Sequence, residues 1–91
     1  MSTNGQKTDY SQMVDYLENL LARQRDRLSV YDIDGARAIA DQTAPLTDEL
    51  TSKRILSQPE FVEHRQRLQQ QYKDICMIIA DQRQEVADKL S

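Results

Sequence analysis

The chain has 91 residues, of which 38% are apolar and 30% charged, with two glycines, two prolines and no tryptophan. This composition is typical of one helical domain in water. A monomer of this size buries only about 60% of its unfolded surface, so we expect self-association. Twelve Lys and Arg against fifteen Asp and Glu give a net charge of −3, and no basic stripe is present. These features argue against nucleic acid as a partner.

The N-terminal segment, residues 1–8, is polar and shows no hydrophobic periodicity, so we expect a flexible lead-in there. Its first seven residues lack the apolar stretch of a signal peptide, and the longest apolar run in the chain is residues 76–80. The single cysteine, Cys76, cannot form an internal disulfide. The sequence therefore predicts a cytoplasmic protein without membrane insertion.

Apolar residues at alternating steps of three and four predict a first helix over residues 9–30. The stripe contains Tyr10, Val14, Leu17, Leu21, Leu28 and Tyr31, and it is interrupted at Gln24. Segment 32–35 predicts a turn, because Asp32 or Asp34 can accept hydrogen bonds from the free N–H groups that begin the next helix. It resembles part of a calcium loop but lacks the third acidic ligand and the distal glutamate, so we expect no metal there.

A second helix is predicted over residues 34–54, with a thinner stripe of smaller side chains. The stripe contains Ala36, Ile39, Ala40, Thr43, Leu46 and Leu50. Pro45 removes one internal hydrogen bond and clashes with the preceding turn, which predicts a kink or short break near residues 42–44.

The third and longest helix is predicted over residues 58–90. Ser57 and Glu60 have the spacing of a capping box, and Pro59 stands in the first turn, where no N–H partner is needed. The apolar stripe continues through Phe61, Leu68, Tyr72, Ile75, Ile79, Val86 and Leu90. We therefore predict one all-α domain over residues 9–91, an antiparallel three-helix bundle or hairpin. Its long last helix lacks intramolecular neighbours over part of its length.

Residues 76–80 make this helix apolar on every side for about one and a half turns. One interpretation is the core of a bundle or homodimer, with Met77 a tolerated surface residue. The other is a groove for the amphipathic helix of a partner protein. The predicted partner-binding residues are Tyr72, Ile75, Cys76, Met77, Ile78 and Ile79. On this interpretation, Ile78→Asp with Met77→Asp abolishes partner binding and leaves helicity intact.

Catalytic and metal-binding patterns are sparse. His64, the only histidine, has no second His or Cys one turn away, so we expect a surface residue, no metal and no cofactor. A small helical dimeric enzyme of the chorismate mutase kind is the alternative. It would use Arg65, Gln82 and Gln24, which interrupt the apolar stripes, with a small anion near Arg65. Polar residues in such stripes more often set helix register, so we expect a non-catalytic protein.

The order of elements resembles a known family. The chain has a first helix with Tyr16-Leu17-Glu18-Asn19-Leu20-Leu21, an acidic turn at 32–34, a middle helix ending at 46–50 and a long last helix. This pattern, over about residues 9–90, resembles flagellar type III export chaperones of the FlgN and FliT kind. The resemblance implies a cytosolic protein that binds a helical terminal segment of a flagellar axial subunit through its last helix. A structural homodimerisation or adaptor module is the other non-catalytic alternative.

Overall fold

The computed structural model describes the backbone of residues 2–90 and the side chains of residues 10–90. Its elements are α1 (Ser2–Ser29), α2 (Ile33–Ser52), two short 3-10 helices, η1 (Ile55–Ser57) and η2 (Pro59–Phe61), and α3 (Val62–Leu90). No strand occurs in residues 2–90. The predicted all-α fold with a long C-terminal helix is therefore confirmed.

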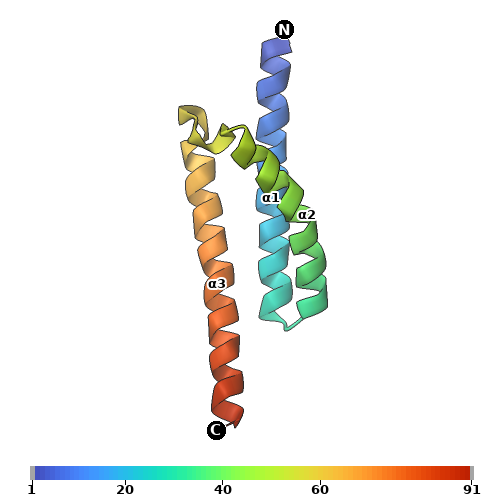
Figure 1. Cartoon of the computed structure of the whole chain (residues 1–91), viewed down its shortest axis with the longest axis vertical. Coiled ribbons are helices and arrows are strands. Elements are labelled where there is room, and N and C mark those ends of the chain that lie inside the picture. Colours follow the sequence, from blue (N-terminus) through green and yellow to red (C-terminus); the bar gives the residue numbers. More distant parts are fainter. Residues whose placement is uncertain (1, 91) are drawn as a thin grey trace.

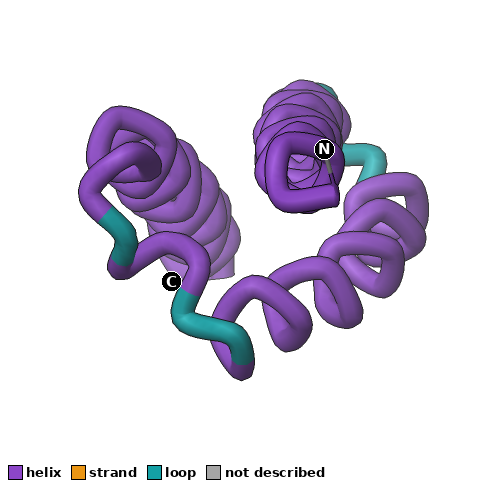
Figure 2. Tube along the Cα trace, turned by 90° about the horizontal axis from the view of Figure 1, so that it is seen from above, coloured by secondary structure: helices purple, strands orange, loops and turns teal. Residues whose placement is uncertain are grey.

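The three helices run down, up and down again along a molecule of 61 × 22 × 19 Å (Figure 1). Helix α1 packs against both α2 and α3, whereas α2 and α3 have few direct contacts with each other. Seen along the long axis, the helices stand at the corners of a triangle, and η1 and η2 connect α2 to α3 at one end (Figure 2). One side of the bundle, between α2 and α3, is thus less tightly closed than the others.

Most of the core belongs to the predicted stripes, whereas Tyr72, Val86 and Leu90 of the third stripe are exposed. The members of the core are Val14, Leu17, Leu21, Leu28, Ala36, Leu50, Ile55, Phe61, Leu68 and Ile75. Each fully buried large aliphatic side chain contributes about 1.5–3 kcal/mol. Tyr31, predicted at the end of the first stripe, is instead exposed, because α1 ends at Ser29 and Tyr31 adopts a left-handed conformation in the turn (φ 63°).

Helix α1 begins at Ser2, seven residues before the predicted start at residue 9. Extending an existing helix costs little once its first turn has formed, and residues 2–8 contain no proline that would stop the extension. The predicted lead-in is therefore part of α1 along its backbone. Its side chains lie outside the described residues, and its flexibility remains a prediction.

The turn between α1 and α2 is fixed by Asp32, one of the two predicted capping residues. Asp32 Oδ1 accepts a hydrogen bond of 3.0 Å from the backbone N–H of Gly35. Its Oδ2 lies 3.5 Å from Arg27 Nη1. The Asp32 carboxylate folds so closely over Gly35 that a Cβ atom at Gly35 would lie 2.2 Å from Oδ2. A side chain at position 35 would therefore displace the Asp32 carboxylate from its capping position, and the calcium-like segment acts as a helix cap.

Replacing Asp32 with alanine is expected to lower the free energy of unfolding by about 1 kcal/mol, because the N–H of Gly35 loses its acceptor. Asp34→Ala is the matched control, since Asp34 is exposed in the first turn of α2 and has no capping hydrogen bond among the described residues. Urea denaturation followed by circular dichroism measures both variants. Equal losses would show that helix-dipole attraction, and not the cap, stabilises this turn.

Helix α2 continues through Pro45 without a break and changes direction toward α3 along its length (Figure 1). Of the two predicted alternatives, a kink or a short break, the helix shows a bend and no break. The Thr43 hydroxyl donates a 2.8 Å hydrogen bond to the Ala40 carbonyl, a contact that bends helices. The bend brings the end of α2 to the start of the connection that leads to α3.

The start of the third helix differs from the prediction. Gln58 precedes η2 without a side-chain cap, so the predicted capping box of Ser57 and Glu60 is not formed, whereas Pro59 does occupy the first turn. Helix α3 begins only at Val62, because the buried side chains of Ile55 and Phe61 hold two short 3-10 turns on the core.

At the C-terminal end of α3, every residue of 83–90 is exposed, and the helix extends beyond the α1–α2 turn (Figure 1). This exposed end corresponds to the predicted part of the helix that lacks a full set of intramolecular neighbours.

Candidate functional site

The structure distributes the six predicted partner-binding residues, 72 and 75–79, around α3. Ile75 is 5% exposed and lies in the core, so it is removed from the accessible surface. Ile78 and Ile79 are partly buried and pack against that core. The predicted effect of Ile78→Asp, loss of partner binding with helicity intact, is therefore corrected: this substitution would perturb folding as well as any partner contact.

The other three predicted residues are exposed but face different surroundings. The Tyr72 hydroxyl lies 3.2 Å from the Thr47 hydroxyl and links α3 to the upper part of α2. Cys76 and Met77 are exposed, Met77 to 55%. Since successive residues of a helix are about 100° apart, a completely apolar turn must place some side chains outside any one interface. The apolar turn is therefore not covered on all sides within one chain.

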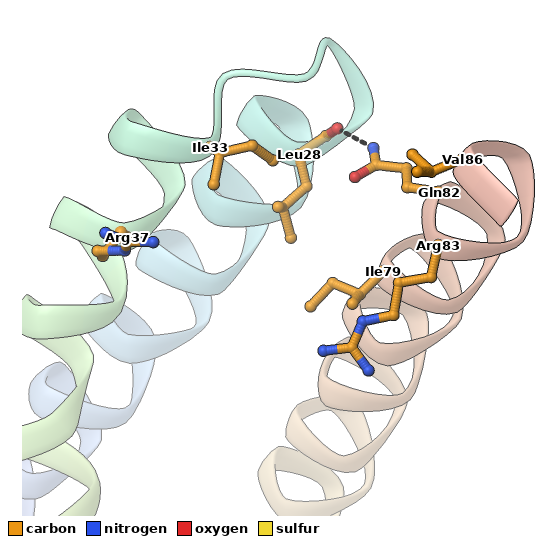
Figure 3. Close-up of a pocket in the computed structure, with 7 residues that line it drawn as sticks. All are labelled: Leu28, Ile33, Arg37, Ile79, Gln82, Arg83 and Val86. Atoms are coloured by element: carbon orange, nitrogen blue, oxygen red, sulfur yellow. Dashed lines mark hydrogen bonds between the residues drawn. The ribbon is translucent and has the colours of Figure 1, made fainter. Parts of the chain in front are cut away.

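A groove of about 540 Å³ lies between the start of α2 and the C-terminal part of α3, next to the α1–α2 turn (Figure 3). It is lined by Leu28, Ile33, Arg37, Ile79, Gln82, Arg83 and Val86. Of the predicted partner-binding residues, only Ile79 belongs to it. The groove is thus built from all three helices, with four aliphatic residues, one amide and two guanidinium groups.

The groove has an apolar interior that the chain leaves accessible. Leu28 is buried at its base, and Ile79 is partly buried on α3. Ile33 and Val86 are exposed to 44% and 55%. Exposed large aliphatic side chains beside a concavity are typical of binding surfaces, because burying them releases water at about 25 cal/mol per Å².

Two hydrogen bonds hold the end of α3 beside the turn. Gln82 Nε2 donates to the backbone carbonyl of Leu28, one of the last carbonyls of α1, which lack a partner within the helix (Figure 3). The Tyr31 hydroxyl donates to the Glu85 carboxylate. Gln82, predicted as an inward-facing polar residue, therefore positions the wall of the groove.

Two titratable groups have shifted pKa values. The hydrogen bond to Glu85 raises the pKa of Tyr31, since ionising the phenol would remove the donated proton beside an anion. At the other end of the molecule, the hydrogen bond to Glu49 and a second contact with Tyr10 raise the pKa of Lys53. Both side chains are exposed, so each shift reflects a local contact and neither marks a reactive group.

A second, polar pocket of about 290 Å³ lies on the α1–α3 face. It is lined by Glu18, Arg25, Arg67, Gln70, Gln71 and Asp74. Its charges are largely paired: Arg67 Nε lies 2.9 Å from Glu18 Oε1, and Gln70 donates to Asp74. Because Arg67 and Glu18 are already paired with each other and Asp74 already accepts a hydrogen bond, this pocket is a less favourable binding site than the apolar groove.

His64 lies near this pocket, within a cluster that also contains Asp15 and Glu18. The three ligand atoms lie within 4.8 Å of one another, the spacing of a metal site. Arg67 Nη2, however, lies 2.9 Å from His64 Nδ1, so a guanidinium already occupies the position beside these atoms and opposes a metal cation. The predicted surface position of His64 is corrected: its side chain is 21% exposed and its ring packs 5.6 Å from that of Phe61.

Within one chain, the residues of the alternative enzyme site do not come together. Arg65 and Gln82 are seventeen positions apart on α3, which corresponds to about 26 Å. Gln82 is engaged by the Leu28 carbonyl, and Arg65 lines neither pocket. Of the three interruptions of the apolar stripes, Gln82 thus serves a local contact at the end of α1.

Sequence reasoning missed most of the groove. Ile33 stands in the acidic turn, and Arg37 and Arg83 stand on the polar faces of their helices. The signal that could have found the site is the combination of Ile33 just after one helix and Val86 near the end of another. The two residues form one surface only because the bundle brings them close together, and the sequence does not show this proximity.

No helix in the described part of the chain is long and apolar enough to cross a membrane. Comparisons of the chain with protein-family models, with curated proteins and with solved structures find no match.

Proposed function

We propose that this protein is non-catalytic and binds an amphipathic helix of a partner protein in the groove between α2 and α3. The observation that carries this proposal is the apolar groove, in which Ile33, Ile79 and Val86 remain accessible beside the loosely closed side of the bundle. A helix of about 10 Å diameter that lies there would add a fourth neighbour and cover these side chains.

The groove favours a helix over a small molecule by its construction. Its walls come from two separate helices, and the exposed end of α3 continues one wall beyond the bundle. A partner helix can bury aliphatic residues spaced three and four apart along such a wall. The mechanism is occlusion: the apolar face of the partner is covered by this protein instead of by other copies of the partner.

The finer proposal is that of a cytoplasmic export chaperone for a flagellar axial subunit. The three-helix fold with a long last helix and the sequence resemblance support it. On this proposal, the chaperone binds a helical terminal segment of the subunit and keeps it from assembling before export. Release follows competition for the groove at the export apparatus.

The test measures binding of labelled terminal helices of flagellar axial subunits to the full chain by fluorescence anisotropy. We expect one peptide per chain and a gain of helicity by circular dichroism, because an amphipathic helix orders as its apolar face is covered. Light scattering over a dilution series supplies the mass. A dimer that does not dissociate and binds none of the peptides would contradict the proposal and identify a structural homodimerisation module.

A further inference from the structure

Two arginines border the apolar groove, and no carboxylate lines it. Arg37 belongs to α2 and Arg83 to α3, and the two side chains lie on opposite sides of the groove (Figure 3). Every other lining residue is neutral. The local charge of the groove is therefore positive, although the whole chain has a net charge of −3.

Both arginines lack a partner among the described residues. Within residues 10–90, neither Arg37 nor Arg83 forms an ion pair or a side-chain hydrogen bond, whereas Arg27 and Arg67 each pair with a carboxylate. Asp34 and Asp41, about one turn to either side of Arg37, do not pair with it and do not line the groove. Two free guanidinium groups thus stand beside an uncovered apolar surface.

From this juxtaposition we infer that the partner helix is acidic along both borders of its apolar face. The inference rests on the proposed function and specifies the chemistry of the partner. A guanidinium binds a carboxylate through two parallel hydrogen bonds, and this pairing gains strength where the neighbouring apolar side chains exclude water. Arg37 receives carboxylates from one border of the helix, and Arg83 receives them from the other.

The net negative charge of the chain does not oppose this binding at close range. At physiological salt, interactions between exposed charges fade over about 8 Å, so a carboxylate in the groove responds mainly to the two nearby arginines. Lysine residues at the same borders of the partner helix would be repelled by these arginines, because both side chains are positively charged. The groove therefore selects partners by charge as well as by apolar pattern.

Three synthetic helical peptides of about 18 residues, roughly five turns, test the inference. They share one leucine face and carry Glu, Gln or Lys at its borders, and each is titrated with the full chain by fluorescence anisotropy. We expect the Glu peptide to bind about tenfold more tightly than the Gln peptide, and the Lys peptide to bind more weakly still. Raising the salt concentration should reduce these differences.

Charge-reversed variants test whether the preference among the three peptides arises from the two arginines of the groove. Arg37→Glu with Arg83→Glu should invert the order, so that the Lys peptide binds best. Arg23→Glu with Lys73→Glu makes the same change in net charge at exposed positions outside the groove, and it should preserve the original order.

The remaining outcomes separate the two proposals. Equal binding of all three peptides, or an order that Arg37→Glu with Arg83→Glu leaves unchanged, would overturn the acidic partner and leave groove binding intact. Binding of no peptide would overturn the proposed function and the inference with it. A dimer by light scattering that the same double variant dissociates would overturn the inference by showing a second copy of this chain in the groove.

Discussion

Leu50→Ala is expected to lower the free energy of unfolding by about 3 kcal/mol. Leu50 is fully buried near the end of α2, in the same cluster as Leu17 of α1 and Ile55 of η1. Its truncation loses aliphatic burial and leaves a cavity at the point where three elements meet. A domain of this size has a total stability of roughly 5–14 kcal/mol, so the loss is a large fraction.

Urea denaturation followed by circular dichroism measures this loss. Leu90→Ala is the control with the same chemical change, since Leu90 is 83% exposed at the end of α3. It should change stability by less than about 0.5 kcal/mol. A small loss at Leu50 would contradict the core described here, whereas a large loss at Leu90 would show that the end of α3 is covered in solution by a second chain.

Ile33→Gln with Val86→Gln is expected to weaken binding of the partner helix roughly a hundredfold. Each glutamine leaves an amide buried without a partner when the helix binds, at a cost of about 1–3 kcal/mol, and two such costs of about 1.4 kcal/mol multiply to this factor. Both side chains are substantially exposed in the free protein, so folding should be preserved. The substitutions keep the net charge and therefore leave the arginines unaffected. Titration with the Glu peptide measures the change.

Met77→Gln is the matched control for Val86→Gln. Both residues are 55% exposed on α3, and nine positions at about 100° each place them on opposite sides of the helix. Met77→Gln should leave the affinity unchanged. A loss at Met77 and none at Val86 would instead return the binding surface to the apolar turn 76–80, as the sequence alone predicted.

Helix formation and much of the core could be predicted from local patterns. Val14, Leu17, Leu21 and Leu28 recur with the helical period, and all four are buried. The acidic turn also predicted a helix cap. Such a cap is formed by residues that are close together in the chain, so a local pattern is enough to indicate it. Which of the two aspartates, Asp32 or Asp34, forms the cap could be decided only from the backbone geometry of the turn.

The start of α3 and the fate of the apolar turn could not be predicted in this way. Ser57 and Glu60 have the spacing of a capping box, but the burial of Ile55 and Phe61 outweighs that local preference and holds two 3-10 turns. In the turn 76–80, the pattern showed that no side is polar but not which side meets the core. Packing places Ile78 and Ile79 against the core and leaves Cys76 and Met77 in solvent.

The sequence by itself determined that the chain forms three amphipathic helices with an aliphatic core, because helical periodicity is a property of residues close together in the chain. Only the tertiary structure decided where a partner can bind. Leu28, Ile33 and Val86 lie on three different helices, and the groove exists because α1 separates α2 from α3 while α3 continues past the turn. A surface built from distant segments depends on how helices pack against each other, which no local pattern contains.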